Sequence, residues 1–106
     1  MDINESLLRA ILMTVGRSAF SPEDIYRVVT PHGGSEKKLI AYNLCDGKTS
    51  QATICTKAKI TKSQLSESIT SWVSAGIVVR VGGDQFPLHI YPLSKENLKA
   101  AKAAQE

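Results

Sequence analysis

The segment that follows Ile60 carries a run of short polar side chains whose groups can hydrogen-bond to nucleic-acid bases. In the major groove, glutamine pairs with adenine, glutamate accepts from cytosine, and serine and lysine also reach base edges. If this segment is a helix that buries Leu65 and Ile69, then Ser63 and Glu67 lie on its opposite side. We therefore predict a base-contacting surface made of Lys62, Ser63, Gln64, Glu67 and Ser68.

Basic side chains occur on both sides of this segment along the chain. The formal charge is only +3, from 13 basic and 10 acidic residues, so a basic surface must come from clustering. Lysine and arginine hold the phosphates of a duplex without reading its sequence. We expect four cations to contact phosphates beside Lys62, namely Lys48, Lys57, Lys59 and Arg80. The predicted partner is double-stranded DNA.

Other residue types that could do chemistry form no motif. Gly33-Gly34 is not followed by the Gly-Lys-Ser/Thr of a phosphate-binding loop, and neither His-Glu-x-x-His nor Gly-x-Ser-x-Gly occurs. The two cysteines are either small buried hydrophobes or a redox switch. The spacing expected of zinc ligands is missing from Cys45, Cys55, His32 and His89. The sequence thus predicts no enzyme, no metal and no cofactor, and it shows no small-molecule effector.

Apolar periodicity and capping residues predict the helices that position these groups. The helix with the polar face begins at Thr61, whose spacing from Gln64 is that of a capping box, and it ends at Gly76. Its buried stripe is expected to include Trp72 and Val73 with Leu65 and Ile69. The remaining helices are expected over residues 2–15 before a stop at Gly16, from Ser21-Pro22, from Ser35 to Leu44, after Thr49 or Ser50, and from Ser94.

Beyond Gly76 the pattern changes to β-branched residues. Residues 77–81 and 88–91 are predicted to be two strands, and Gly82-Gly83-Asp84 is typical of the turn between them. The fold class is therefore mainly α with a small β-hairpin. It is built from a three-helix core, the hairpin and additional helices at both termini.

The segments at residues 44–47, 50–54, 60–66 and 72–78 resemble winged helix-turn-helix regulators of the ArsR-like and MarR-like families. The resemblance implies a sequence-specific transcriptional regulator that acts as a dimer on pseudo-palindromic DNA. It also implies a wing that approaches the minor groove or its phosphates through Gly82, Gly83, Asp84 and Gln85. The chain lacks the Cys or His cluster of ArsR-type metal sensors and is shorter than most MarR-type proteins. The alternative is a winged-helix module that binds protein within a larger complex.

The 106 residues fit a single domain, with terminal helices at 1–34 and 93–106 around a winged helix-turn-helix core at 35–92. The apolar face of the first helix exceeds what this core can cover, so we predict a homodimer. Its interface is expected to use Leu7, Leu8, Ile11 and Leu98. No apolar run is long enough to span a membrane, and the N-terminus does not resemble a signal peptide, so a cytoplasmic protein is expected.

Overall fold

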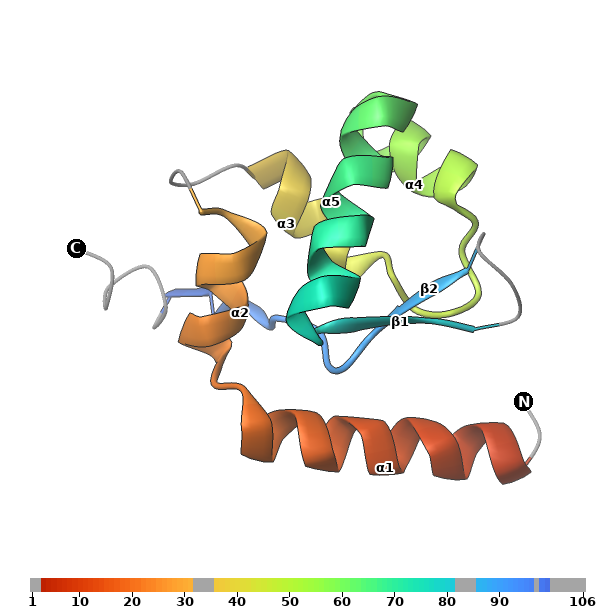
Figure 1. Cartoon of the computed structure of the whole chain (residues 1–106), viewed down its shortest axis with the longest axis vertical. Coiled ribbons are helices and arrows are strands. Elements are labelled where there is room, and N and C mark those ends of the chain that lie inside the picture. The colour runs from red at the N-terminus through yellow and green to blue at the C-terminus, as the bar shows by residue number, and fades with distance from the viewer. Residues whose placement is uncertain (1–2, 32–35, 82–85, 97, 100–106) are drawn as a thin grey trace.

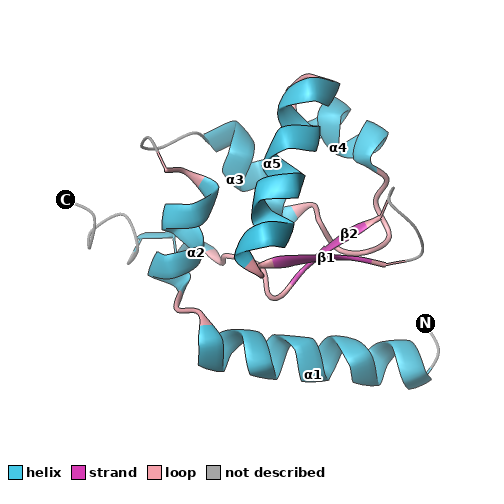
Figure 2. Ribbon diagram, viewed as in Figure 1, coloured by secondary structure: helices cyan, strands magenta, loops and turns pink. Residues whose placement is uncertain are grey.

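The computed structural model describes residues 3–31, 36–81, 86–96 and 98–99, and within them the chain forms five helices and a two-stranded antiparallel sheet (Figures 1 and 2). The prediction of a mainly helical fold with a small hairpin is confirmed. No helix in these ranges has the length and apolarity to cross a membrane. The elements, in chain order, are α1 (Ile3–Ala19), α2 (Pro22–Val29), α3 (Glu36–Asn43), α4 (Gln51–Ala58), α5 (Lys62–Ala75), β1 (Val78–Arg80) and β2 (Pro87–His89).

Helix α1 lies at one end of the molecule, whereas α4 and the beginning of α5 lie at the opposite end (Figure 1). Helices α3, α4 and α5 lie on the other side of the hairpin from α1, and α2 lies beside the hairpin and joins α1 directly (Figure 1). A single short hairpin cannot bury itself, and α5 packs against β1. This arrangement leaves the start of α5 far from α1.

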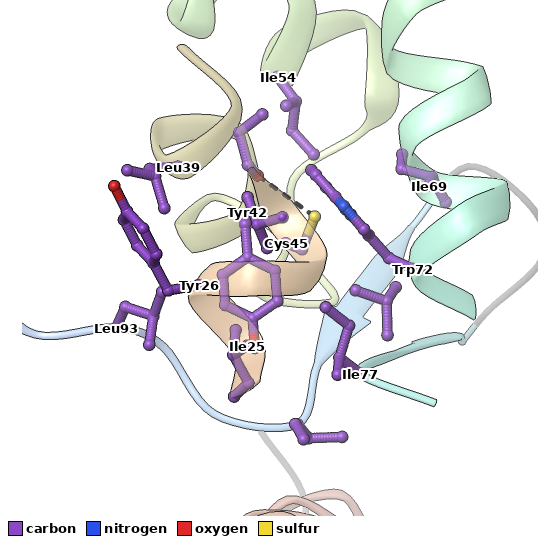
Figure 3. Close-up of a cluster of buried hydrophobic side chains, with 14 of the residues drawn as sticks. Ile25, Tyr26, Leu39, Tyr42, Cys45, Ile54, Ile69, Trp72, Ile77 and Leu93 are labelled. Carbon is purple, nitrogen blue, oxygen red and sulfur yellow. Dashed lines mark hydrogen bonds between the residues drawn. The ribbon is translucent and has the colours of Figure 1, made fainter. Parts of the chain in front are cut away.

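The core is built around Trp72, which is 1% exposed and meets the Tyr42 ring edge-on at 5.8 Å between centroids (Figure 3). An edge-to-face pair of this kind adds about 1 kcal/mol beyond the area it buries. Trp72 is therefore the core residue that the sequence predicts. Helix α2 contributes Ile25 and Val29 to the same cluster, so the core extends beyond residues 35–92.

The prediction that the first helix stops at Gly16 is wrong, because α1 continues through Gly16 to Ala19. The glycine allows a close approach instead: a Cβ built at this position would lie 2.8 Å from the Cβ of Ile90. Ile90 follows β2, so α1 crosses the end of the hairpin at the one residue that has no side chain. The periodicity of one helix cannot reveal such a contact between distant segments.

Helix α1 is also attached near its middle. A guanidinium nitrogen of Arg9 donates to the backbone carbonyl oxygen of Asp46, which lies in the loop between α3 and α4. The same loop pairs with the hairpin, because Asp46 forms a bridge with Leu88 and the Gly47 N–H donates to the Pro87 carbonyl at 2.8 Å. Helix α1, this loop and β2 are thus tied together.

The hairpin is shorter than the sequence predicts. Its register pairs Val78 with His89 and Arg80 with Pro87, so Pro87 begins β2 instead of flanking it. A proline is tolerated as the first residue of an edge strand because no ladder hydrogen bond needs its nitrogen. Beyond the sheet, residues 95–96 and 98–99 are helical, as expected for a segment that follows Ser94.

Candidate nucleic-acid interface

Helices α4 and α5 are joined by the short turn Lys59-Ile60-Thr61. Ser50 caps α4, its hydroxyl accepting from the Thr53 N–H, and Lys59 ends the helix in the left-handed conformation at φ 59°. The Ile60 N–H then donates back to the Cys55 carbonyl at 3.1 Å. This turn fixes the direction in which α5 begins.

The N-terminus of α5 is held by the capping box that the sequence predicts. The Thr61 hydroxyl accepts from the Gln64 N–H at 3.1 Å, and the Gln64 side-chain oxygen accepts from the Thr61 N–H at 3.2 Å. At the other end Gly76 has φ 87°, which confirms the predicted left-handed stop. Because the cap holds its oxygen at the Thr61 N–H, the Gln64 side chain is not free to turn both its oxygen and its nitrogen toward one base.

The side of α5 opposite its buried stripe is polar and exposed. Ser63 and Glu67 lie on it as predicted, and the row continues at helical spacing through Thr70 and Ser74. Lys62 is exposed at the first position of the helix. The expectation that Val73 is buried is wrong: it is 36% exposed, since Trp72 takes the central place in the core.

The prediction that Ser68 contacts bases needs correction, because this residue is only 9% exposed. It lies on the side of α5 that faces α2, in a hollow of about 240 Å³ whose wall includes Val28, Val29 and Trp72. Gln64 and Glu67 line the rim of this hollow. The sequence could not reveal the burial of Ser68, because α2 lies more than thirty residues earlier in the chain.

The predicted phosphate-contacting cations form two groups. Lys57 and Lys59 belong to the end of α4 and the turn after it, beside Lys62 at the start of α5, and all three are exposed. Lys48 and Arg80 lie at the hairpin instead, because the loop that carries Lys48 pairs with β2 and Arg80 ends β1. Both are exposed. Sequence order alone did not show this division.

The loop that carries Lys48 is ordered by a carboxylate. One side-chain oxygen of Asp46 accepts from the backbone N–H groups of Lys48 and Thr49, both at 2.8 Å. Burial acts to raise the pKa of the Asp46 carboxyl, but the hydrogen bonds from Lys48 and Thr49 hold it below its usual value. The ionised carboxylate therefore fixes the backbone at Lys48.

The predicted wing tip, Gly82, Gly83, Asp84 and Gln85, lies outside the described residues. The hairpin is closed just before it, where the Val81 N–H donates to the Phe86 carbonyl at 3.1 Å. His32, Gly33 and Gly34 also lie outside the described ranges.

The thiols show no arrangement for redox or metal chemistry in the described parts of the chain. Cys45 is fully buried, its thiol donates to the Ala41 carbonyl at 3.3 Å, and burial raises its pKa to about 12 (Figure 3). Cys55 is half-buried, so the expectation of a buried hydrophobe fits Cys45 better. No group of three or more potential metal ligands occurs among the described residues.

His89 is a buried ionisable group that the sequence motifs did not indicate. It is 5% exposed, its Nδ1 atom has no hydrogen-bond partner among the described residues, and its ring centroid lies 5.5 Å from that of Tyr42. Burial lowers the pKa of this imidazole. Its position in a predicted strand between Leu88 and Ile90 is the signal that could have indicated burial.

No protein-family model matches the chain, and no curated protein or solved structure is significantly similar to it.

Proposed function

We propose that this protein is a winged helix-turn-helix protein that binds double-stranded DNA with the first half of α5 in the major groove. The observation that carries the proposal is the beginning of α5, where an exposed polar face adjoins three exposed lysines, Lys57 at the end of α4, Lys59 in the turn and Lys62 at the start of α5. An α-helix fits the major groove, and the N-terminal residues of a recognition helix are the ones that meet base edges.

In this proposal Ser63 and Glu67 contact bases, and Lys62 stands at the edge of the groove. A serine hydroxyl donates or accepts, and a glutamate oxygen accepts from the cytosine amino group. Thr70 extends the same face toward the second turn of the helix. Ser68 takes no part because it is buried against α2.

The two groups of cations fit two contacts with the sugar–phosphate backbone. Lys57 and Lys59 would hold the strand beside the start of α5, and Lys48 and Arg80 would hold phosphates near the hairpin. The hairpin then serves as the wing. Phosphate contacts fix the register of a protein on its duplex, whereas base contacts supply the specificity. Such a module suits a transcriptional regulator, which must select one site among many.

The experiment measures fluorescence anisotropy of a labelled duplex with random sequence at about 50 mM salt. The variant Lys57→Glu/Lys59→Glu/Lys62→Glu should bind at least tenfold more weakly than the wild type, since three phosphate contacts become repulsive. The matched control Lys37→Glu reverses one exposed charge on α3 and should bind nearly as well as the wild type.

A wild type that binds no duplex under these conditions would contradict the proposal. The fold would then serve as a protein-binding module of a larger complex.

A further inference from the structure

Helix α1 has two faces of different character. Its inner face carries Leu12 and Met13 against the core, Gly16 against Ile90, and Arg9 on the loop carbonyl of Asp46. Its outer face carries five large apolar side chains that are between 52% and 84% exposed, namely Ile3, Leu7, Leu8, Ile11 and Val15. The described part of the molecule leaves this second face uncovered.

The outer face of α1 can also be removed from water at a low cost in unpaired polar groups. The charged side chains of α1 that the structure describes lie away from it, Arg9 at Asp46 and Arg17 over the Tyr91 ring. Its two hydroxyls, of Thr14 and Ser18, donate back to the carbonyls of Ala10 and Thr14 at 2.8 and 3.2 Å. Covering this face would therefore strand neither arginine and neither hydroxyl donor, and the exposed Asn4 amide beside Leu7 and Leu8 is the polar group that remains on it.

We propose that the outer face of α1 binds the same face of a second copy, forming a homodimer with a helix–helix interface. The five apolar side chains expose roughly 500 Å², near the upper end of the largest apolar patch on a typical monomer. With the small residues between them, the exposed area of the face approaches the area of about 800 Å² that each partner buries in a standard interface. The area fits a reversible dimer.

The spacing of the face suits a copy of itself. Ile3, Leu7, Ile11 and Val15 repeat every four residues and form one ridge along α1. Identical ridges of this kind interdigitate when two helices cross at about −50°. Because no described side chain on the face is charged, the +3 charge of each copy does not set like charges against each other at the contact. A lipid surface is a poorer occupant, since an interfacial helix uses lysine and arginine to contact headgroups, whereas Arg9 and Arg17 of α1 contact Asp46 and Tyr91.

The proposed interface differs in one residue from the interface expected from the sequence. Leu7, Leu8 and Ile11 remain in it, whereas Leu98 is partly buried against the core and lies with Leu39 and Ile40 beside α3. Helix α1 is at the opposite end of the molecule from the start of α5 (Figure 1). Pairing through α1 therefore leaves the proposed DNA-binding surface exposed, and the two proposals stand independently.

The test is light scattering during size-exclusion chromatography, without DNA, from about 1 to 200 μM. The wild type should change from a mass near 11.5 kDa to twice that value as concentration rises. Ile11→Glu and Leu7→Glu should each weaken association at least tenfold. The matched control Ile40→Glu, which alters a 47% exposed residue on α3, should dimerise like the wild type, as should Ile11→Met. Circular dichroism checks that each variant is folded.

A wild-type mass that stays at 11.5 kDa up to 200 μM would overturn the proposal. So would a dimer that folded Ile11→Glu and Leu7→Glu leave intact, because another surface would then form it. Co-sedimentation of the monomer with anionic vesicles, lost in Ile11→Glu, would assign the face to lipid and equally overturn it.

Discussion

The hydroxyl of Tyr42 in α3 donates a hydrogen bond of 2.7 Å to the backbone carbonyl of Tyr91, 49 residues later in the chain. The Tyr91 hydroxyl in turn donates to the carbonyl of Phe20 at 2.6 Å. These two bonds connect α3, the segment after β2 and the junction between α1 and α2. Two tyrosines thus hold together three regions that are distant in sequence.

Tyr42→Phe should lower the free energy of unfolding by about 1–3 kcal/mol, because it leaves a buried carbonyl without its donor. The matched control is Tyr26→Phe, since Tyr26 is also buried and no hydrogen bond of its hydroxyl occurs within the described residues. Urea denaturation followed by circular dichroism gives both values. Equal losses in the two variants would mean that the bond to Tyr91 contributes nothing.

Gly16→Ala should destabilise the protein, although alanine normally stabilises a helix interior by about 1 kcal/mol relative to glycine. The new methyl would lie 2.8 Å from the Cβ of Ile90, so α1 or the segment after β2 must shift to make room for it. Ser6→Ala, at an exposed position of α1, is the control and should raise the melting temperature slightly. A stabilised Gly16→Ala protein would show that α1 does not pack closely at this point.

Stability should fall as the pH decreases below about 6.5, the ordinary pKa of histidine. Burial lowers the pKa of His89 in the folded chain, with the Asp46 carboxylate raising it and Arg9 lowering it further. The unfolded chain therefore binds the proton first, so folding is favoured above pH 6.5 and weakened as the pH falls through the folded pKa. The melting temperature measured from pH 7.5 to 5.0 tests this.

In the same titration His89→Gln should lose most of the dependence on pH. His32→Gln, which alters the only other histidine, should retain it. An unchanged slope in His89→Gln would place the titrating group elsewhere.

Ser63→Ala and Glu67→Ala should change which duplex sequences are preferred, because the proposal places both side chains at base edges. Each lost contact is expected to cost about 1–3 kcal/mol at its base pair. Ser68→Ala is the matched control, since a buried serine on the same helix should leave the preference unchanged. Selection from a random duplex library gives the preferred sequences. Identical preferences in the wild type and all three variants would contradict the proposal that this face of α5 contacts bases.

Much of the helical structure could be predicted because caps and periodicity are local. The capping box of Thr61 and Gln64, the cap at Ser21 and the left-handed Gly76 all depend on neighbouring residues, and all three are confirmed. The structural roles of Gly16 and Lys59 could not be predicted from neighbouring residues. The glycine serves a contact with Ile90, and the lysine adopts a left-handed conformation that sequence patterns assign to glycine or asparagine.

The candidate site could likewise be predicted where it depends on neighbouring residues, but not where it depends on tertiary contacts. The exposure of Ser63 and Glu67 follows from helix geometry once Leu65 and Ile69 are buried, and the structure places them so. The burial of Ser68 depends on α2, and the separation of the cations depends on the pairing of the loop after α3 with β2. Both are tertiary contacts, which a single sequence does not encode in any local pattern.

DNA binding is tested most directly by the salt dependence of the affinity of the wild-type protein for duplex DNA, between about 50 and 200 mM salt. One copy offers five cations, so a plot of log affinity against log salt should have a slope of about −4.5, or about −9 if two copies bind together. A steep slope in this range supports phosphate contacts by Lys48, Lys57, Lys59, Lys62 and Arg80. A flat response, or no binding even at the lowest salt, would contradict the proposal that this protein binds DNA.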